Sequence, residues 1–226
     1  MEKKITFHNH REYWESDEFI RDWFGLKKEV KINNYHRSFQ KKLLALPRME
    51  KFPIVAYGSL MNEFDAERTV GTTEAFIMSI PGWERVFDIG HFEKGSFLNV
   101  RKSTKGNSMD VIIRYVNWNK MPALLLRESL YDIEEVVAID MAGEEHLVYM
   151  VVAEDYYTNP WLLPQLNYLH LCMTGIKESG DYRMMENFLK TTYCYSDELA
   201  KEVTLEVWLE NLNLSNYLQR YTYSPR

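Results

Sequence analysis

The chain has 226 residues, 46% of them hydrophobic and 14% aromatic, so it can bury a sizeable core without disulfides, metals or a partner. Its formal net charge of −6 gives phosphate backbones no general attraction, which argues against nucleic acid as a partner. No run approaches the roughly 20 apolar residues of a membrane span. The charged start at residues 1–5 lacks a secretory stretch, and only two cysteines are present, so we expect a cytoplasmic protein without a membrane partner.

Residues 1–50 are predicted to form an N-terminal helical arm. Ser16 can cap an amphipathic helix whose apolar residues recur at helical spacing, and Gly25 is a plausible stop for it. A second helix is predicted from Tyr35 to Leu46, before Pro47.

From residue 51 to 158 the sequence predicts a mixed core of short strands. Apolar or alternating runs separated by turn residues favour strands at 52–56, 73–80, 84–89, 97–101, 110–116, 135–140 and 146–153. Residues 120–131 are predicted to be a short helix, and Gly106-Asn107 is a hairpin-like turn signal.

Residues 159–226 are predicted to form C-terminal helices packed on the core. Helical patterns cover about 166–173, 181–190 and 196–212, the last with Ser196 as its cap, although part of it could also form a strand. Gly175 and Gly180 are interpreted as bracketing a turn between helices. The predicted fold class is α+β, with a small mixed β-barrel-like core between N- and C-terminal helices.

The most informative local feature is Val55-Ala56-Tyr57-Gly58-Ser59-Leu60, an apolar strand that stops at a Gly-Ser turn. Glycine there can let successive amide N–H groups point at one spot and form an anion or oxyanion site. An ordinary tight turn is the alternative. Ser59 as a nucleophile is disfavoured, because a hydrolase elbow needs G-x-S-x-G and Met61 stands at its last position.

A carboxylate in an apolar segment is the second feature. Glu128 follows three leucines, and burial there would raise its pKa towards the range useful for proton transfer. The alternative is a surface salt bridge with Arg127 or Lys120. Because His91, His146 and His170 are isolated and no Cys/His spacing suits zinc, we predict no metal and no cofactor.

Taken together, these segments resemble the γ-glutamylcyclotransferase-like family over about residues 53–195. The resemblance rests on Val55-Ala56-Tyr57-Gly58-Ser59-Leu60-Met61, Pro81-Gly82-Trp83-Glu84-Arg85-Val86-Phe87, Leu98-Asn99-Val100 and Leu125-Leu126-Arg127-Glu128-Ser129-Leu130-Tyr131. The stretch from Leu166 to Gly180 is similar to a helix and turn of the branch that acts on γ-glutamyl dipeptides. Leu60 stands where members often have Asn, and Asp110 where many have glycine.

The resemblance implies a small α+β barrel-like fold and a cofactor-free enzyme. Backbone amides of Tyr57, Gly58, Ser59 and Leu60 would hold a γ-glutamyl group, and Glu128 would be the acid/base that releases 5-oxoproline and a free amine. Tyr131 could pack against the bound ring, although an aromatic at this spacing is more often a core residue. The expected partner is a small γ-glutamyl substrate, and self-association into a homo-oligomer is left open. The alternative is a catalytically silent binding module.

Overall fold

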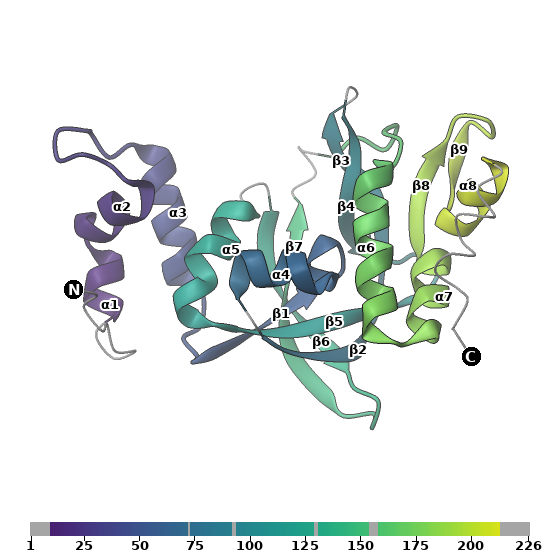
Figure 1. Ribbon diagram of the computed structural model, residues 1–226, viewed down its shortest axis with the longest axis horizontal. Coiled ribbons are helices and arrows are strands. Elements are labelled where there is room, and N and C mark those ends of the chain that lie inside the picture. Colours follow the sequence, from purple (N-terminus) through teal and green to yellow (C-terminus); the bar gives the residue numbers. More distant parts are fainter. Residues whose placement is uncertain (1–9, 72, 92–93, 129–130, 154–157, 213–226) are drawn as a thin grey trace.

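The computed structural model describes residues 10–71, 73–91, 94–128, 131–153 and 158–212, which form helices and two sheets (Figure 1). The helices are α1 (His10–Glu15), α2 (Asp17–Phe24), α3 (Asn34–Ala45), η2 (Ser59–Met61), α4 (Glu63–Val70), η3 (Trp118–Lys120), α5 (Met121–Arg127), α6 (Leu166–Ser179), α7 (Tyr182–Thr191) and α8 (Leu205–Asn211). The strands are β1 (Lys51–Ala56), β2 (Glu74–Pro81), β3 (Trp83–His91), β4 (Gly95–Lys102), β5 (Ser108–Asn117), β6 (Tyr131–Ile139), β7 (Glu145–Ala153), β8 (Thr192–Ser196) and β9 (Lys201–Thr204).

Five strands close into a barrel in the order β1-β5-β2-β6-β7. Neighbouring strands are antiparallel except β1 and β7, which run parallel where Ile54 faces Tyr149. Every residue of β1 after Lys51 is buried, because one face of the strand lines the barrel and the other is covered by protein. The predicted α+β fold with a small mixed barrel-like core is confirmed.

A second sheet has the order β4-β3-β8-β9 and corrects the prediction of a helix over 196–212. Strand β8 lies parallel to β3, with Thr192 opposite Arg85, and turns back through β9. Only Leu205–Asn211 is helical, and Thr204 rather than Ser196 is its N-cap. The aromatic and β-branched side chains of β8 favour a strand once a sheet edge is available, which local periodicity cannot reveal.

Three smaller predictions were also wrong. Gly175 lies inside α6, which ends at Ser179 with Gly180 as a left-handed cap. The helix predicted over 120–131 ends at Arg127, and Tyr131 already belongs to β6. The turn at Gly106 joins β4 to β5, but these strands belong to different sheets and form no hairpin.

Helix α6 can contain Gly175 because the backbone of another segment passes close to it. A Cβ atom at this position would lie 2.3 Å from the amide nitrogen of Asn62 and 2.4 Å from the carbonyl carbon of Met61. These are backbone atoms of the turn that follows β1, so they cannot move aside as a flexible side chain would. The glycine therefore lets α6 pack directly against that turn.

We expect Gly175→Ala to destabilise the protein by about 1–3 kcal/mol, because the added methyl overpacks this contact. The sign of the change in the free energy of unfolding identifies the cause, since the same exchange in a solvent-facing helix stabilises the protein by about 1 kcal/mol. Urea unfolding of the variant beside Thr174→Ala, its neighbour in α6, measures the difference. An unchanged or increased free energy of unfolding in Gly175→Ala would contradict the close contact.

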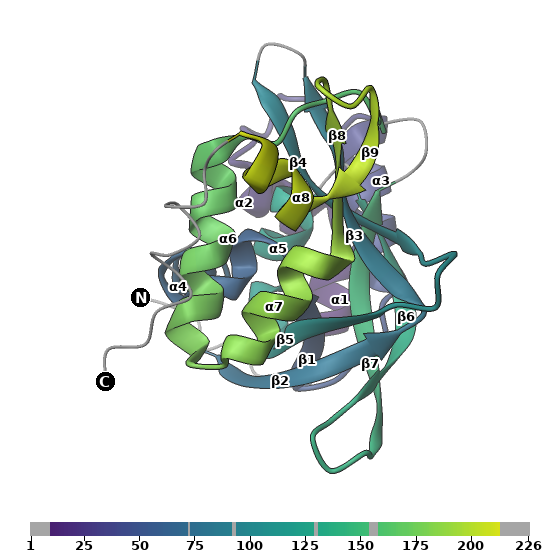
Figure 2. The ribbon, with the colours of Figure 1, turned by 90° about the vertical axis from the view of Figure 1, so that its right-hand side faces the viewer.

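The N-terminal helices pack beside α5 (Figure 1) and lie on the far side of the molecule in the view of Figure 2. The rings of Trp14 and Trp118 stack at 5.3 Å, and Lys42 pairs with Asp132 of β6 at 2.6 Å. The predicted caps of the arm are confirmed, because Ser16 accepts from the amide of Phe19 and Gly25 is left-handed. None of the helices in the described part of the chain has the length and apolarity that crossing a membrane requires.

Candidate active site

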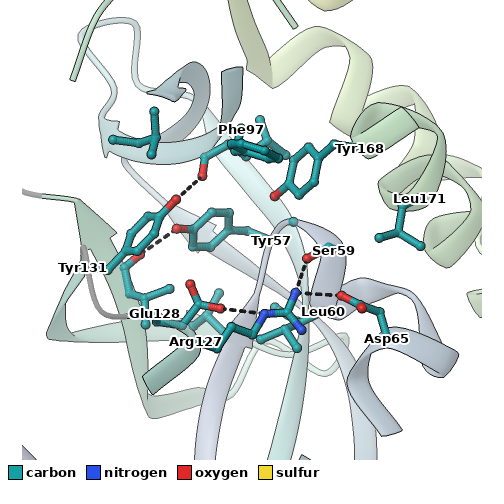
Figure 3. A pocket seen from close by; sticks show the side chains of 16 residues that line it. Tyr57, Ser59, Leu60, Asp65, Phe97, Arg127, Glu128, Tyr131, Tyr168 and Leu171 are labelled. Carbon is teal, nitrogen blue, oxygen red and sulfur yellow. Dashed lines mark hydrogen bonds and ion pairs between the residues drawn. The ribbon is translucent and has the colours of Figure 1, made fainter. Parts of the chain in front are cut away.

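A cavity of about 340 Å³ opens between the turn after β1, the end of α5, strand β4 and helix α6 (Figure 3). All six residues that the sequence singled out line it: Tyr57, Gly58, Ser59, Leu60, Glu128 and Tyr131. Its remaining lining residues are Val55, Ala56, Asp65, Ile89, Phe97, Leu98, Arg127, Val151, Tyr168 and Leu171. The Gly-Ser turn and the glutamate, which are far apart in the sequence, therefore meet at one cavity.

Two buried arginines hold the turn in place through hydrogen bonds to its carbonyl groups. Arg85 of β3 donates from Nε to the Tyr57 carbonyl at 3.1 Å, and Arg114 of β5 donates to the carbonyls of Leu60 and Met61 at 2.6 and 3.1 Å. Burial lowers the pKa of Arg85 to about 10, so its guanidinium is still charged at neutral pH. These contacts fix the backbone of the turn that lines the cavity.

Gly58 serves a different purpose from the predicted one. Its φ of −126° lies outside the left-handed region, but a Cβ here would lie within 2.4 Å of the Tyr168 hydroxyl oxygen. That hydroxyl also takes a hydrogen bond from the Ser59 amide and one with the Cys172 thiol. Glycine is thus required for the close approach of Tyr168, a cavity residue that the sequence-based prediction did not identify.

Arg127 forms the centre of a polar network on the cavity wall. Its Nη2 donates to Ser59 Oγ and, at 2.6 Å, to Asp65 Oδ2, while its Nη1 donates to Thr69 Oγ1 at 2.6 Å. Its Nε lies 3.1 Å from Glu128 Oε1. The Arg127–Glu128 salt bridge, which the sequence offered as the alternative role of Glu128, therefore exists. It lines the cavity instead of lying on the outer surface, and the network of Arg127 joins the turn, α4 and the end of α5.

Glu128 combines burial with a charged neighbour. It caps the C-terminus of α5 with only 14% of its side chain exposed. Burial raises the pKa of this carboxyl and nearby Asp65 adds to the rise, while Arg127 opposes both. The partial negative charge at a helix C-terminus also disfavours the carboxylate. A carboxyl that gains and loses its proton closer to neutrality is suited to general acid/base catalysis.

The aromatic walls are anchored by their hydroxyl groups. Tyr57 donates to the Val151 carbonyl at 2.8 Å, and Tyr131 donates to the Leu98 carbonyl at 3.1 Å. Burial raises the pKa of both hydroxyls, and the Glu128 carboxylate raises them further, so the two rings remain neutral. They present fixed apolar faces to whatever the cavity holds.

Asp110, one of the two departures from the family pattern, lies away from the cavity. Its side chain accepts from Ser79, and its carbonyl accepts from Arg85. Leu60, the other departure, lines the cavity. Any effect on ligand binding is therefore expected from Leu60 before Asp110.

One group of potential metal ligands occurs among the described residues. Asp140, Glu144 and His146 bring their ligand atoms within 4.8 Å of one another at the turn between β6 and β7. The Asp140 carboxylate already accepts from the amides of Ala142 and Glu144 and bonds His146 at 2.8 Å. These contacts account for the cluster as a turn-closing network.

Comparison with models of known protein families gives no match, and comparison with curated protein sequences gives none either. Solved structures do match. A crystal structure of an uncharacterized protein from Homo sapiens aligns with a TM-score of 0.51 and 19% identity over 58% of this chain and 82% of that one. A gamma-glutamyl cyclotransferase aligns with a TM-score of 0.50 and 18% identity over 58% of this chain and 81% of that one. The resemblance seen in the sequence is thus confirmed at the level of the fold, and the chain has the γ-glutamylcyclotransferase-like fold.

Proposed function

We propose that the protein is a γ-glutamylcyclotransferase-like enzyme, which converts a γ-glutamyl compound into 5-oxoproline and a free amine or amino acid without a cofactor. One observation carries the proposal. A largely buried carboxyl of raised pKa, Glu128, lines the same cavity as the turn of Tyr57, Gly58 and Ser59. We also propose that the reaction takes place in the cytoplasm.

In the proposed reaction Glu128 carries a proton between two nitrogens. Its carboxylate takes a proton from the substrate's α-ammonium group, and the freed amine attacks the γ-carbonyl carbon to form the ring C–N bond. Glu128 then returns the proton to the departing nitrogen as the original amide bond breaks. The α-nitrogen gives up a second proton as it becomes the ring N–H, and the departing nitrogen takes up a second proton to leave as an ammonium, so the protons balance when Glu128 makes the same transfer twice. No oxidant or water is consumed, so a single acid/base residue suffices.

The other parts of the cavity suit this intramolecular attack. Amide groups of the turn could donate to the oxyanion that develops at the γ-carbonyl, which is the arrangement that stabilises such a tetrahedral stage. The anchored rings of Tyr57 and Tyr131 would hold the substrate folded, so that its amine lies near its own carbonyl. Gly58, Ser59 and Leu60 would complete the binding surface.

The direct test is to incubate the purified full-length chain with a panel of γ-glutamyl dipeptides and γ-glutamylamines and to quantify 5-oxoproline. Two matched controls are α-glutamyl dipeptides and N-acetylated γ-glutamyl substrates, which lack the correct carbonyl or the free nucleophile. Product is expected from some members of the panel and from neither control. Absence of 5-oxoproline across a broad panel would count against the enzyme.

The main alternative is a catalytically silent binding module on the same fold. It is favoured by the fact that Tyr168 already occupies the Ser59 amide and that Arg127 has four partners within the protein. Such a module would bind 5-oxoproline or a γ-glutamyl compound in calorimetry and release no product.

An acyl hydrolase that uses Ser59 as nucleophile is the third candidate, and Ser59→Ala separates it from the others. The Ser59 hydroxyl accepts a hydrogen bond from Arg127, and this bond orders the turn. The lone pairs of the Ser59 oxygen therefore face a cation, which makes the hydroxyl a poor nucleophile. We therefore expect Ser59→Ala to lower 5-oxoproline release by about tenfold to a hundredfold, which corresponds to the loss of one charge-assisted hydrogen bond. Complete inactivity, together with labelling of wild type by a serine-directed probe, would favour the hydrolase.

A further inference from the structure

A second cavity, of about 230 Å³, is lined by residues of α1, α2, η3 and the start of α5. It is lined by Tyr13, Trp14, Phe19, Asp22, Trp23, Asn119 and Pro122. Four of these seven residues are aromatic and one is acidic. The cavity is separate from the candidate active site, with which it shares no residue.

The aromatic residues are packed against one another in fixed orientations. Tyr13 meets Phe19 edge-on at 5.7 Å, and Trp23 stacks on Phe19 at 6.4 Å. Phe19 and Trp14 are nearly fully buried, and Trp14 is stacked on Trp118. The walls are therefore rigid, so that a ligand would find them already assembled.

The only charged residue in the lining is acidic. Asp22 accepts from the Tyr13 hydroxyl at 2.9 Å and, within the described residues, forms no ion pair. Burial raises the pKa of Tyr13, and Asp22 and then Glu18 add to the rise, to about 12. Arg21, in the same helix, is directed elsewhere, to the carbonyls of Lys27 and Val30.

We propose that this cavity binds a quaternary trimethylammonium group, with the partly exposed rings of Tyr13 and Trp23 beside the methyl groups and the Asp22 carboxylate near the positive charge. Aromatic faces attract cations, and quaternary ammonium groups benefit most because they are poorly hydrated. The volume is below the roughly 300 Å³ at which pockets for drug-sized ligands begin, so a head group fits the cavity better than a large ligand. The inference is independent of the proposed enzyme activity.

The test compares choline with 3,3-dimethyl-1-butanol, which has the same shape without the charge. Binding to the full-length protein is followed by the NMR signal of the Trp23 indole at constant ionic strength, the signal being assigned by Trp23→Phe. We expect choline to saturate this shift and the neutral compound to bind about fivefold more weakly or worse. Equal affinity for both compounds, or no saturable shift with choline, would overturn the proposal.

Two variants of equal charge separate a site from general attraction to an acidic surface. Asp22→Asn keeps the shape and the contact with Tyr13, and it should weaken choline binding about threefold or more. Glu186→Gln removes an exposed charge from α7, on the far side of the molecule, and should leave it unchanged. Equal effects of the two variants would contradict the site.

Trimethyl-lysine methylamide presents the same head group, and its affinity relative to choline shows whether a modified side chain or a small amine fits better.

Discussion

Glu128→Gln should reduce 5-oxoproline release by about 10²–10⁴-fold, the usual contribution of a positioned general acid/base. The amide has the shape of the carboxyl but can neither take the proton from the substrate's amine nor return it to the leaving group. The binding of 5-oxoproline should survive, since the turn and the aromatic walls are untouched. Product quantification and calorimetry on the same preparation measure the two effects.

The matched control is Glu134→Gln, the same exchange at an exposed position of β6, which should keep full activity. Misfolding is not expected to explain the loss at Glu128. Because the pKa of Glu128 is raised in the folded state, that state holds the proton more tightly than the unfolded chain. Wild type therefore loses stability as the pH rises from the unfolded pKa through the folded one, whereas Glu128→Gln does not. Full activity of Glu128→Gln would remove the glutamate from the mechanism.

Much of the fold could be predicted because its signals are local. The strands of the barrel coincide with short apolar or alternating runs, and β1 and β5 begin and end within two residues of their predicted positions. Ser16 and Gly25 mark the ends of α2 because capping uses side chains and backbone of the same turn.

The errors arose in segments whose secondary structure depends on contacts with residues far away in the sequence. Strand β8 is stable beside β3, some hundred residues earlier, and Gly175 belongs inside a helix because the backbone at Met61 and Asn62 passes it. A glycine in a sequence predicts a turn, and no neighbouring residue indicates that a distant segment packs where a side chain would otherwise lie.

The same limit applies to the candidate site. The turn and Glu128 were identified because each is unusual in its own segment. Tyr168 and Asp65 are ordinary residues of helices, and they line the cavity only because α6 and α4 pack beside the turn. Tyr168 does lie in the stretch that is similar to the family's helix, a signal that could have suggested it.

Arg127→Met should move the acid limb of the pH profile of kcat/KM to higher pH. Glu128 must be ionised to accept the substrate's proton, so the limb follows its pKa. Arg127 is the group that holds this pKa down against burial and Asp65, and methionine keeps the apolar stem without the charge. Removing the cation therefore leaves the carboxyl protonated to a higher pH. If turnover is absent, a ¹³C NMR titration of the Glu128 carboxyl measures the same shift.

The variant should also lose about 1–3 kcal/mol of stability, because Ser59, Thr69 and the nearly buried Asp65 lose a donor together. Arg68→Met is the matched control. Arg68 pairs with the same Asp65 at 3.2 Å, but its side chain is 72% exposed, so this ion pair should contribute little. Arg127→Lys keeps the positive charge without the planar set of donors. It should therefore lower the pKa of Glu128 part of the way back towards the wild-type value, but it should not restore the stability. An acid limb in Arg127→Met that stays in place or moves down would show that Arg127 does not tune Glu128, even if the protein is destabilised as expected.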